Sequence, residues 1–114
     1  MTDCLFCKMI NGEIKADVVY ENDQVLAFRD INPQAPVHVL VIPKQHISTI
    51  NDLDESDANT VGQLFLAAKS IANDLGVAEE GYRTVINCNA MAGQTVFHIH
   101  LHLLAGRAMH WPPG

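Results

Sequence analysis

The segment His98-Ile99-His100-Leu101-His102-Leu103-Leu104 alternates histidine with apolar residues, and this pattern decides how the rest of the chain is interpreted. In a β-strand, successive side chains point to opposite faces of the sheet. The three histidines would then share one face, and the other face would carry Phe97, Ile99, Leu101 and Leu103. In a helix the histidines would stand about 200° apart and share no face. The pattern therefore predicts a strand with an apolar back and an imidazole front.

Such a row of imidazoles has three interpretations: metal ligands, ordinary polar surface, or groups that act in catalysis near neutral pH. Alternate residues of a strand lie about 6 to 7 Å apart. An ion with bonds of about 2.0 to 2.1 Å reaches two such neighbours more easily than three. The spacing therefore favours catalysis over a metal site built from all three histidines.

The bulk properties are those of a globular protein, and we expect one domain over residues 1–114. The chain is 48% hydrophobic and 18% charged, with a formal net charge of -6. This charge argues against binding to nucleic acid or to an anionic membrane surface. A small phosphorylated ligand remains compatible with this net charge, provided that imidazolium and backbone N–H groups meet the charge of the phosphate locally.

The N-terminus lacks a basic segment followed by an apolar one, and no apolar run approaches 18 residues. We therefore expect a cytoplasmic protein. Its three cysteines, Cys4, Cys7 and Cys88, are an odd number, so reduced thiols are expected. The Cys4-x-x-Cys7 spacing has two interpretations. The cysteines could form half of a zinc site, with His46 and His98 available to complete it, or they could be two small buried apolar residues.

The local patterns predict strands at residues 18–20, 25–30, 37–42 and 82–87, in addition to 98–104. A long helix is predicted after Asp54 or Ser56, which are suitable N-cap residues, and it should end at Gly76. Its apolar stripe is expected to pack on the back of the sheet and comprises Val61, Leu64, Phe65, Ala68, Ile71, Ala72 and Leu75.

His38 is the only polar side chain in an otherwise apolar strand. It is therefore either a structural histidine of the core or, if this strand pairs with the histidine-rich strand, a member of the front-face row. The loop at residues 88–95 contains small residues, which would allow backbone N–H groups to approach an anion.

The chain resembles the histidine triad (HIT) superfamily, and in particular its Hint branch. The resemblance depends on the His98–Leu104 pattern and on four further motifs: Phe28–Pro36, Val41–Ser48, Gly93–Phe97 and Met109–Gly114. It implies an α+β fold with an antiparallel sheet of about five strands, one long helix on its back and a short N-terminal helix. It also implies a homodimer with a sheet that is continuous across the interface.

The resemblance further implies hydrolysis of purine nucleoside 5′-phosphoramidates and of aminoacyl-adenylates. His100 would be the nucleophile, and it would form a nucleotidyl-histidine that water then cleaves. His102 would hydrogen-bond the phosphate, and His38 would orient the nucleophile. Thr95 would place a hydroxyl near the phosphate and the leaving group, where the family often has serine.

The resemblance also implies a binding site for a purine nucleotide such as AMP or GMP. Asp30 would accept hydrogen bonds from the ribose. The base would lie in an apolar slot formed by Leu5, Phe6, Met9, Phe28 and Ile31. The residues near the phosphate would be Asn87, Gly93, Gln94 and Val96. Trp111, in the C-terminal tail, would extend towards the partner's site and influence the leaving-group preference.

The two cysteines are absent from many Hint proteins. In the branch that has them, the matches of Cys4, Cys7, His46 and His98 bind a structural zinc ion that the chemistry does not require. Two alternative functions stay open, namely a dinucleoside polyphosphate hydrolase and a nucleotide-binding module that acts through protein partners. A zinc-handling protein is a third, whereas a nucleotidyl transferase is disfavoured because that branch usually has glutamine at the position of His102.

Overall fold

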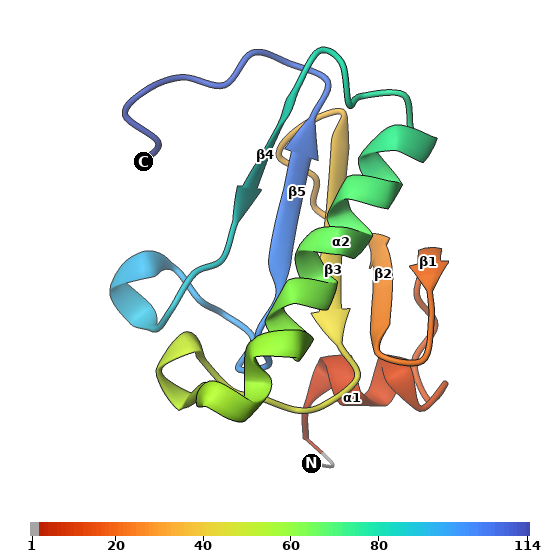
Figure 1. The fold of residues 1–114 in the computed structure, drawn as a ribbon, viewed down its shortest axis with the longest axis vertical. Helices are drawn as coiled ribbons and strands as arrows, with labels where there is room; N and C mark the ends of the chain where they lie inside the picture. Colours follow the sequence, from red (N-terminus) through yellow and green to blue (C-terminus); the bar gives the residue numbers. More distant parts are fainter. Residues whose placement is uncertain (1–2) are drawn as a thin grey trace.

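The computed structural model describes residues 3–114 and contains one five-stranded antiparallel sheet (Figure 1). The strands are β1 (Val18–Glu21), β2 (Val25–Arg29), β3 (Val37–Pro43), β4 (Tyr82–Val85) and β5 (Leu101–Ala105), in the spatial order β1-β2-β3-β5-β4. The α-helices are α1 (Leu5–Ile10) and α2 (Ala58–Asp74). The predicted sheet, long helix and short N-terminal helix are thereby confirmed.

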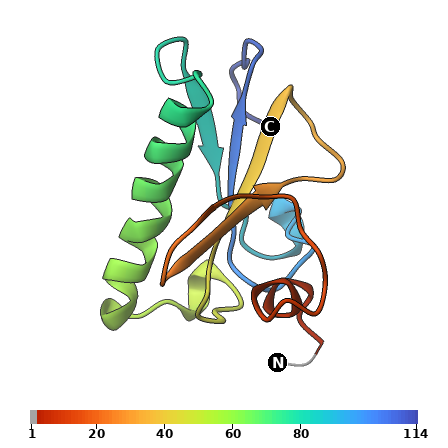
Figure 2. The ribbon, with the colours of Figure 1, turned by 90° about the vertical axis from the view of Figure 1, so that its right-hand side faces the viewer.

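The two helices lie on opposite faces of the sheet, as the edge-on view of Figure 2 shows. The back face packs against α2 in a cluster of Val25, Ala27, Val39, Val41, Leu64, Ala67, Ala68, Ile71, Leu101 and Leu103. The front face packs against α1 in a smaller cluster of Phe6, Leu26, Phe28, Leu40 and Ile42. Because alternate strand residues face opposite sides, the same strands contribute to both clusters.

Helix α2 ends where predicted, but it begins at Ala58 after the N-cap Asp57, not directly after Asp54 or Ser56, and its buried stripe is slightly different. Asp54 caps the short 3-10 helix that leads into it, since its side chain accepts a hydrogen bond from the Ser56 N–H. Gly76 ends it with a φ of 73°, a conformation that glycine adopts without strain. Phe65, predicted in the stripe, is 46% exposed, whereas Ala67 is 2% exposed. The small alanines face the sheet, and the bulky Phe65 lies at the margin of the contact.

Strand β5 begins at Leu101, so the prediction of a strand from His98 to Leu104 was wrong at its start. Its neighbour β3 ends at Pro43, which has no N–H to continue the ladder. The Ile99 N–H instead donates to the carbonyl of Ile47, in the loop after β3, at 2.7 Å. Phe97 was predicted on the apolar back of the sheet. It is 48% exposed, because it lies before Ile99, where this bond attaches the chain to the loop after β3.

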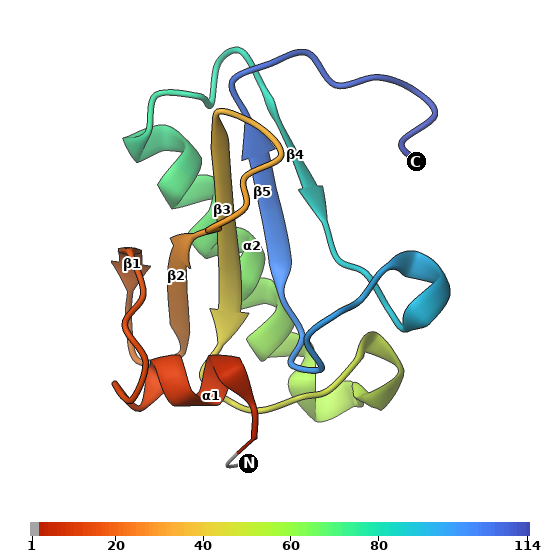
Figure 3. The ribbon, with the colours of Figure 1, turned by 180° about the vertical axis from the view of Figure 1, so that it is seen from behind.

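Strand β4 pairs with β5 alone among the described residues, and it ends at Val85 instead of Asn87. Seen from behind, the C-terminal segment runs outward past β4 (Figure 3). Within residues 3–114, no helix combines the length and apolarity needed to cross a bilayer.

Candidate active site

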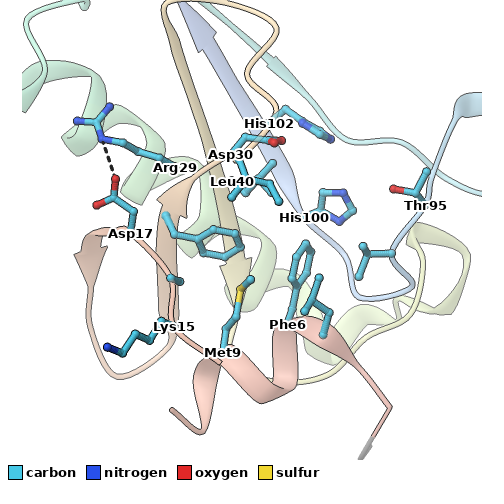
Figure 4. A pocket seen from close by; sticks show the side chains of 15 residues that line it. Phe6, Met9, Lys15, Asp17, Arg29, Asp30, Leu40, Thr95, His100 and His102 are labelled. Atoms are coloured by element: carbon cyan, nitrogen blue, oxygen red, sulfur yellow. Dashed lines mark ion pairs between the residues drawn. The ribbon is translucent and has the colours of Figure 1, made fainter. Parts of the chain in front are cut away.

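A cavity of about 600 Å³ lies on the front face of the sheet, beside α1 (Figure 4). Apolar side chains dominate its lining, and His100, His102 and Thr95 lie together at one end. Asp30 adds a carboxylate from the end of β2. The full lining consists of Leu5, Phe6, Met9, Lys15, Ala16, Asp17, Phe28, Arg29, Asp30, Ile31, Leu40, Thr95, Val96, His100 and His102.

The backbone fixes the protonation of His100. Its Nδ1 lies 2.8 Å from the carbonyl oxygen of His98, and a carbonyl can only accept a hydrogen bond. The Nδ1 therefore carries the proton, and the lone pair of the neutral ring is on Nε2. The residue is 7% exposed and lines the cavity. Within residues 3–114 its Nε2 has no hydrogen-bond partner, and a buried imidazole with such a free Nε2 beside a cavity is suited to nucleophilic attack.

A chain of hydrogen bonds fixes the protonation of His38 and His102. The Gln34 N–H donates to Nδ1 of His38 at 3.0 Å, so the proton of a neutral His38 is on Nε2. This Nε2–H donates to Nδ1 of His102 at 2.9 Å. His102 must then carry its own proton on Nε2, where it can donate to an anion. The chain thus prepares a hydrogen-bond donor next to the nucleophile.

Among the described residues His38 contacts His102 and not His100, and its role in orienting the nucleophile stays a prediction. His38 bonds His102, and its Nε2 lies 3.4 Å from the Asp30 carboxylate. The group that holds His100 is the His98 carbonyl. The reason is the strand register, in which His38 pairs with Leu104 and Leu40 pairs with His102, so Leu40 separates His38 from His100 along the front face.

Burial lowers the pKa of the histidines at this site. The pKa of His102 falls to about 4, because desolvation disfavours the charged ring and His100 and His38 add repulsion, while Asp30 partly opposes the shift. The pKa of His38 is also lowered, chiefly by desolvation and again against the effect of Asp30. The site therefore contains neutral imidazoles near pH 7, as the acceptor roles of Nδ1 in His38 and His102 require.

The lowered pKa of His102 predicts a loss of stability in mild acid. In the unfolded chain a histidine takes up its proton near pH 6.5, whereas folded His102 takes it up near pH 4. Between these values the unfolded state binds more protons, so the free energy of unfolding should decrease as the pH falls from 6.5 towards 4. Urea denaturation at several pH values measures this slope.

His102→Gln should reduce that slope, because glutamine does not titrate. The reduction should be smaller than the about 1.4 kcal/mol per pH unit that one full proton would give, since the side chain is only half-buried. His110→Gln is the matched control, because His110 is exposed in the C-terminal segment. Equal slopes in the wild type and His102→Gln would contradict the pKa assignment.

Most of the predicted nucleotide-binding residues meet at the cavity. The cavity brings together Leu5, Phe6, Met9, Phe28, Asp30, Ile31 and Val96 with the two histidines and Thr95. These residues come from α1, β2, β5 and the loops beside them. Phe6 is 3% exposed, whereas Ile31 is fully exposed at the rim, so the slot is closed at one end and open at the other.

Four predicted residues do not line this cavity. Gln94 is 6% exposed, and its amide group is occupied by the Asn89 N–H and by the carbonyls of Ser48 and Val96. These bonds hold the loop before β5 in place, and the position of Gln94 near the phosphate stays a prediction. Asn87 is half-buried and Gly93 is exposed, and neither contributes to the lining. Trp111 is 83% exposed in the C-terminal segment.

Five lining residues were missed, namely Lys15, Ala16, Asp17, Arg29 and Leu40. Leu40 could have been found, because it lies two residues after His38 and so shares its face of the strand. Asp17 and Arg29 form an ion pair of 3.7 Å at the cavity margin. The segment before β1 has no periodic pattern, and nothing in its sequence indicates that it folds back onto this face.

A second group of side chains joins Cys4 and Cys7 of the α1 region to His46 and His98, as the cysteine spacing suggested. His98 donates from Nε2 to the Pro43 carbonyl at 2.8 Å, which leaves its Nδ1 lone pair free. That Nδ1 lies 3.3 Å from the Cys4 sulfur, 3.6 Å from the Cys7 sulfur and 3.2 Å from Nδ1 of His46. The Cys7 sulfur lies 3.4 Å from Nδ1 of His46.

These separations fit a tetrahedral metal site. With metal–ligand bonds of about 2.0 to 2.3 Å, the edges of the tetrahedron are about 3.3 to 3.8 Å long. Two sulfurs and two imidazole nitrogens are a donor set that zinc prefers. Burial and the adjacent Cys4 raise the pKa of the Cys7 thiol, so a cation is needed to stabilise both thiolates.

The group of Asp30, His38 and His102 also brings three potential ligand atoms together. However, the Gln34 N–H places the His38 proton on Nε2, the atom that would have to bind the metal. The group is therefore a hydrogen-bonded chain, whereas the Cys4–Cys7–His46–His98 group has its lone pairs directed inward.

The HIT domain family model matches residues 11–109. The chain is 54% identical over 112 residues to an uncharacterised HIT-like protein of Synechococcus elongatus, covering 98% of this chain and 97% of that protein. It is 47% identical over 107 residues to the purine nucleoside phosphoramidase of Escherichia coli K12, covering 94% and 90%. The solved structure of a HIT family hydrolase from Legionella pneumophila Philadelphia 1 has a TM-score of 0.96 and 55% identity, covering 98% and 100%. The chain therefore belongs to the HIT family.

Proposed function

We propose that this protein hydrolyses purine nucleoside 5′-phosphoramidates, with His100 as the nucleophile. The observation that carries the proposal is the free Nε2 of His100, which lies at a cavity that combines an apolar wall with the Asp30 carboxylate. A HIT family hydrolase and a purine nucleoside phosphoramidase among the relatives add support. In this proposal the base lies along the apolar wall and the ribose hydroxyls donate to Asp30.

The reaction would proceed in two displacements at the α-phosphorus. Nε2 of His100 forms a bond to phosphorus while the P–N bond of the substrate breaks, and the amine leaves after taking up a proton from solvent. Water then attacks the phosphorus, breaks the bond to His100 and releases the nucleoside monophosphate. His102 donates from Nε2 to a phosphate oxygen as negative charge develops there. The Thr95 hydroxyl assists on the side of the departing nitrogen.

The proposal includes a structural zinc ion and a homodimer. Cys4, Cys7, His46 and His98 would hold the zinc, which would supply a fold-stabilising crosslink and no step of the chemistry. The dimer would join through β4, which is one of the two edge strands of the sheet within residues 3–114 and which contacts the C-terminal segment through the bond from Arg83 to the His110 carbonyl. The exposed Trp111 would then be available to the partner's cavity and influence leaving-group preference.

The test is to incubate the protein with adenosine 5′-phosphoramidate and to follow AMP formation, together with mass spectrometry of the acid-quenched or denatured reaction. We expect turnover and an adenylyl adduct on the peptide that contains His100. Diadenosine polyphosphates should be compared in parallel, because the same nucleophile could attack a phosphoanhydride. Faster turnover of those substrates would favour the alternative hydrolase. Tight AMP binding without turnover of either class would favour a nucleotide-binding module and refute the proposal.

A further inference from the structure

Helix α1 is too short to be stable without contacts to other parts of the molecule. It is six residues long, and an isolated helix of that length is not stable in water. Phe6 is its only buried residue. Its position must therefore come from attachments to the rest of the molecule.

The cysteines provide such an attachment at the N-terminal end of the helix. Cys4 is the N-cap residue and Cys7 lies one turn later. Their sulfurs meet His46 from the loop after β3 and His98 from the segment before β5. Ligation of one ion by all four would join three separate segments, in which His46 follows Cys7 by 39 positions and His98 follows Cys4 by 94 positions. A crosslink over such distances strongly restricts the chain.

Phe6 lies between the two cysteines in sequence and connects this cluster with the nucleophile. Its ring is 5.1 Å from the ring of His100 and 5.8 Å from that of His98, with both contacts edge-to-face. It also packs on Phe28 at 5.5 Å. Leu5 and Met9, from the same helix, line the cavity as well. The segment that carries two metal ligands is therefore also one wall of the nucleotide cavity.

Without a metal, these four side chains would bind one another weakly. Thiols are poor hydrogen-bond donors and acceptors. The His98 proton is held on Nε2 by Pro43, so the Nδ1 lone pair of His98 faces Nδ1 of His46 at 3.2 Å. Only one proton could bridge that pair of nitrogens, whereas a metal satisfies all four groups together.

We propose that the Cys4–Cys7–His46–His98 cluster controls nucleotide affinity. By ligating a metal, it holds α1 in place as one wall of the cavity and keeps Phe6 in contact with His100. We call this arrangement the clamp. This inference rests on the proposed nucleotide-binding function of the cavity. Phe6 is then a positioning residue, because it links the metal ligands to the ring of the nucleophile. Loss of the metal frees α1 and opens the slot, while the sheet and α2 keep their structure.

The test compares the zinc-loaded protein with the same protein after chelation, using AMP as the probe. We expect the Kd for AMP, measured by calorimetry, to rise by about tenfold or more on metal removal and to recover when zinc is restored. Hydrogen exchange should accelerate in residues 4–10 but not in α2, which serves as an internal control. An unchanged Kd, or unchanged protection of residues 4–10, would overturn the clamp.

Two variants and one control variant extend the test. Cys7→Ser should reproduce the weak AMP binding of the metal-free protein, whereas Cys88→Ser, which changes a half-buried cysteine outside the cluster, should bind like the wild type. Phe6→Leu retains the metal ligands, and it should weaken AMP binding while zinc content stays at the wild-type level. If Cys7→Ser does not fold, chelation of the wild type still decides the outcome.

The same measurements separate this inference from the proposed function. If the zinc-loaded protein binds AMP in a metal-dependent way but does not cleave adenosine 5′-phosphoramidate, the proposed reaction fails and the clamp stands. If it cleaves that substrate, and AMP binding does not respond to metal removal, the reaction stands and the clamp fails.

Discussion

His100→Ala should lower kcat for adenosine 5′-phosphoramidate by about 10⁴-fold or more, because it removes the atom that bonds to phosphorus. The Kd for AMP should change much less, since the apolar wall and Asp30 remain. Steady-state kinetics and calorimetry measure the two quantities separately. In the same variant, the adenylyl adduct should disappear from the quenched reaction.

The control for this variant is His110→Ala, which removes an imidazole from an exposed position far along the chain. Its kcat should match that of the wild type. The unfolding transition of His100→Ala should also be recorded, because the variant opens a cavity next to Phe6. Turnover by folded His100→Ala at the wild-type rate would contradict the nucleophile assignment, whatever the rate of the control.

Leu64→Ala should lower the free energy of unfolding by about 2 to 5 kcal/mol, which is the usual cost of removing a buried leucine. Leu64 is 0% exposed and belongs to the cluster between α2 and the back of the sheet. That cluster is the larger of the two clusters and includes residues from β2, β3 and β5. Urea denaturation gives the change directly, and the melting temperature should fall by about 10 °C or more.

Leu66→Ala is the matched control, because it makes the same chemical change two residues further along α2. Leu66 is 58% exposed, so its removal should alter the free energy of unfolding by no more than about 0.5 kcal/mol. A loss at Leu66 equal to that at Leu64 would contradict the assignment of that side of α2 to the exposed face. The difference between the two variants therefore measures the burial of the α2 stripe.

The fold was predictable to the extent that it depends on periodic patterns. The apolar and β-branched residues at 25–30 and 37–42 predicted two strands, the second of them central and well buried, and both are present as β2 and β3. The helical period identified α2 and its end at Gly76. The errors lie at the ends of elements, such as the start of β5, because an end depends on where the neighbouring strand stops.

The candidate site was predictable in part for the same reason. Period-two alternation places His100 and His102 on one face, and the resemblance identified Asp30 and the residues of α1. The role of His38 required the strand register, since only the pairing with β5 determines which ring it meets. The hydrogen bonds of the Gln94 amide could not be predicted, because the sequence does not show which backbone groups lie beside it.

The sequence by itself determined the local structure: where α2 and the centres of the strands lie, and which of their faces are apolar. The tertiary structure decided the protonation of His98 and His102, because the Pro43 carbonyl and the His38 ring that bond them lie 55 and 64 positions away in the sequence. It also decided that the cysteines and Phe6 meet the histidines. Contacts over 90 or more residues depend on packing of the whole chain, whereas strand and helix patterns arise from neighbouring residues.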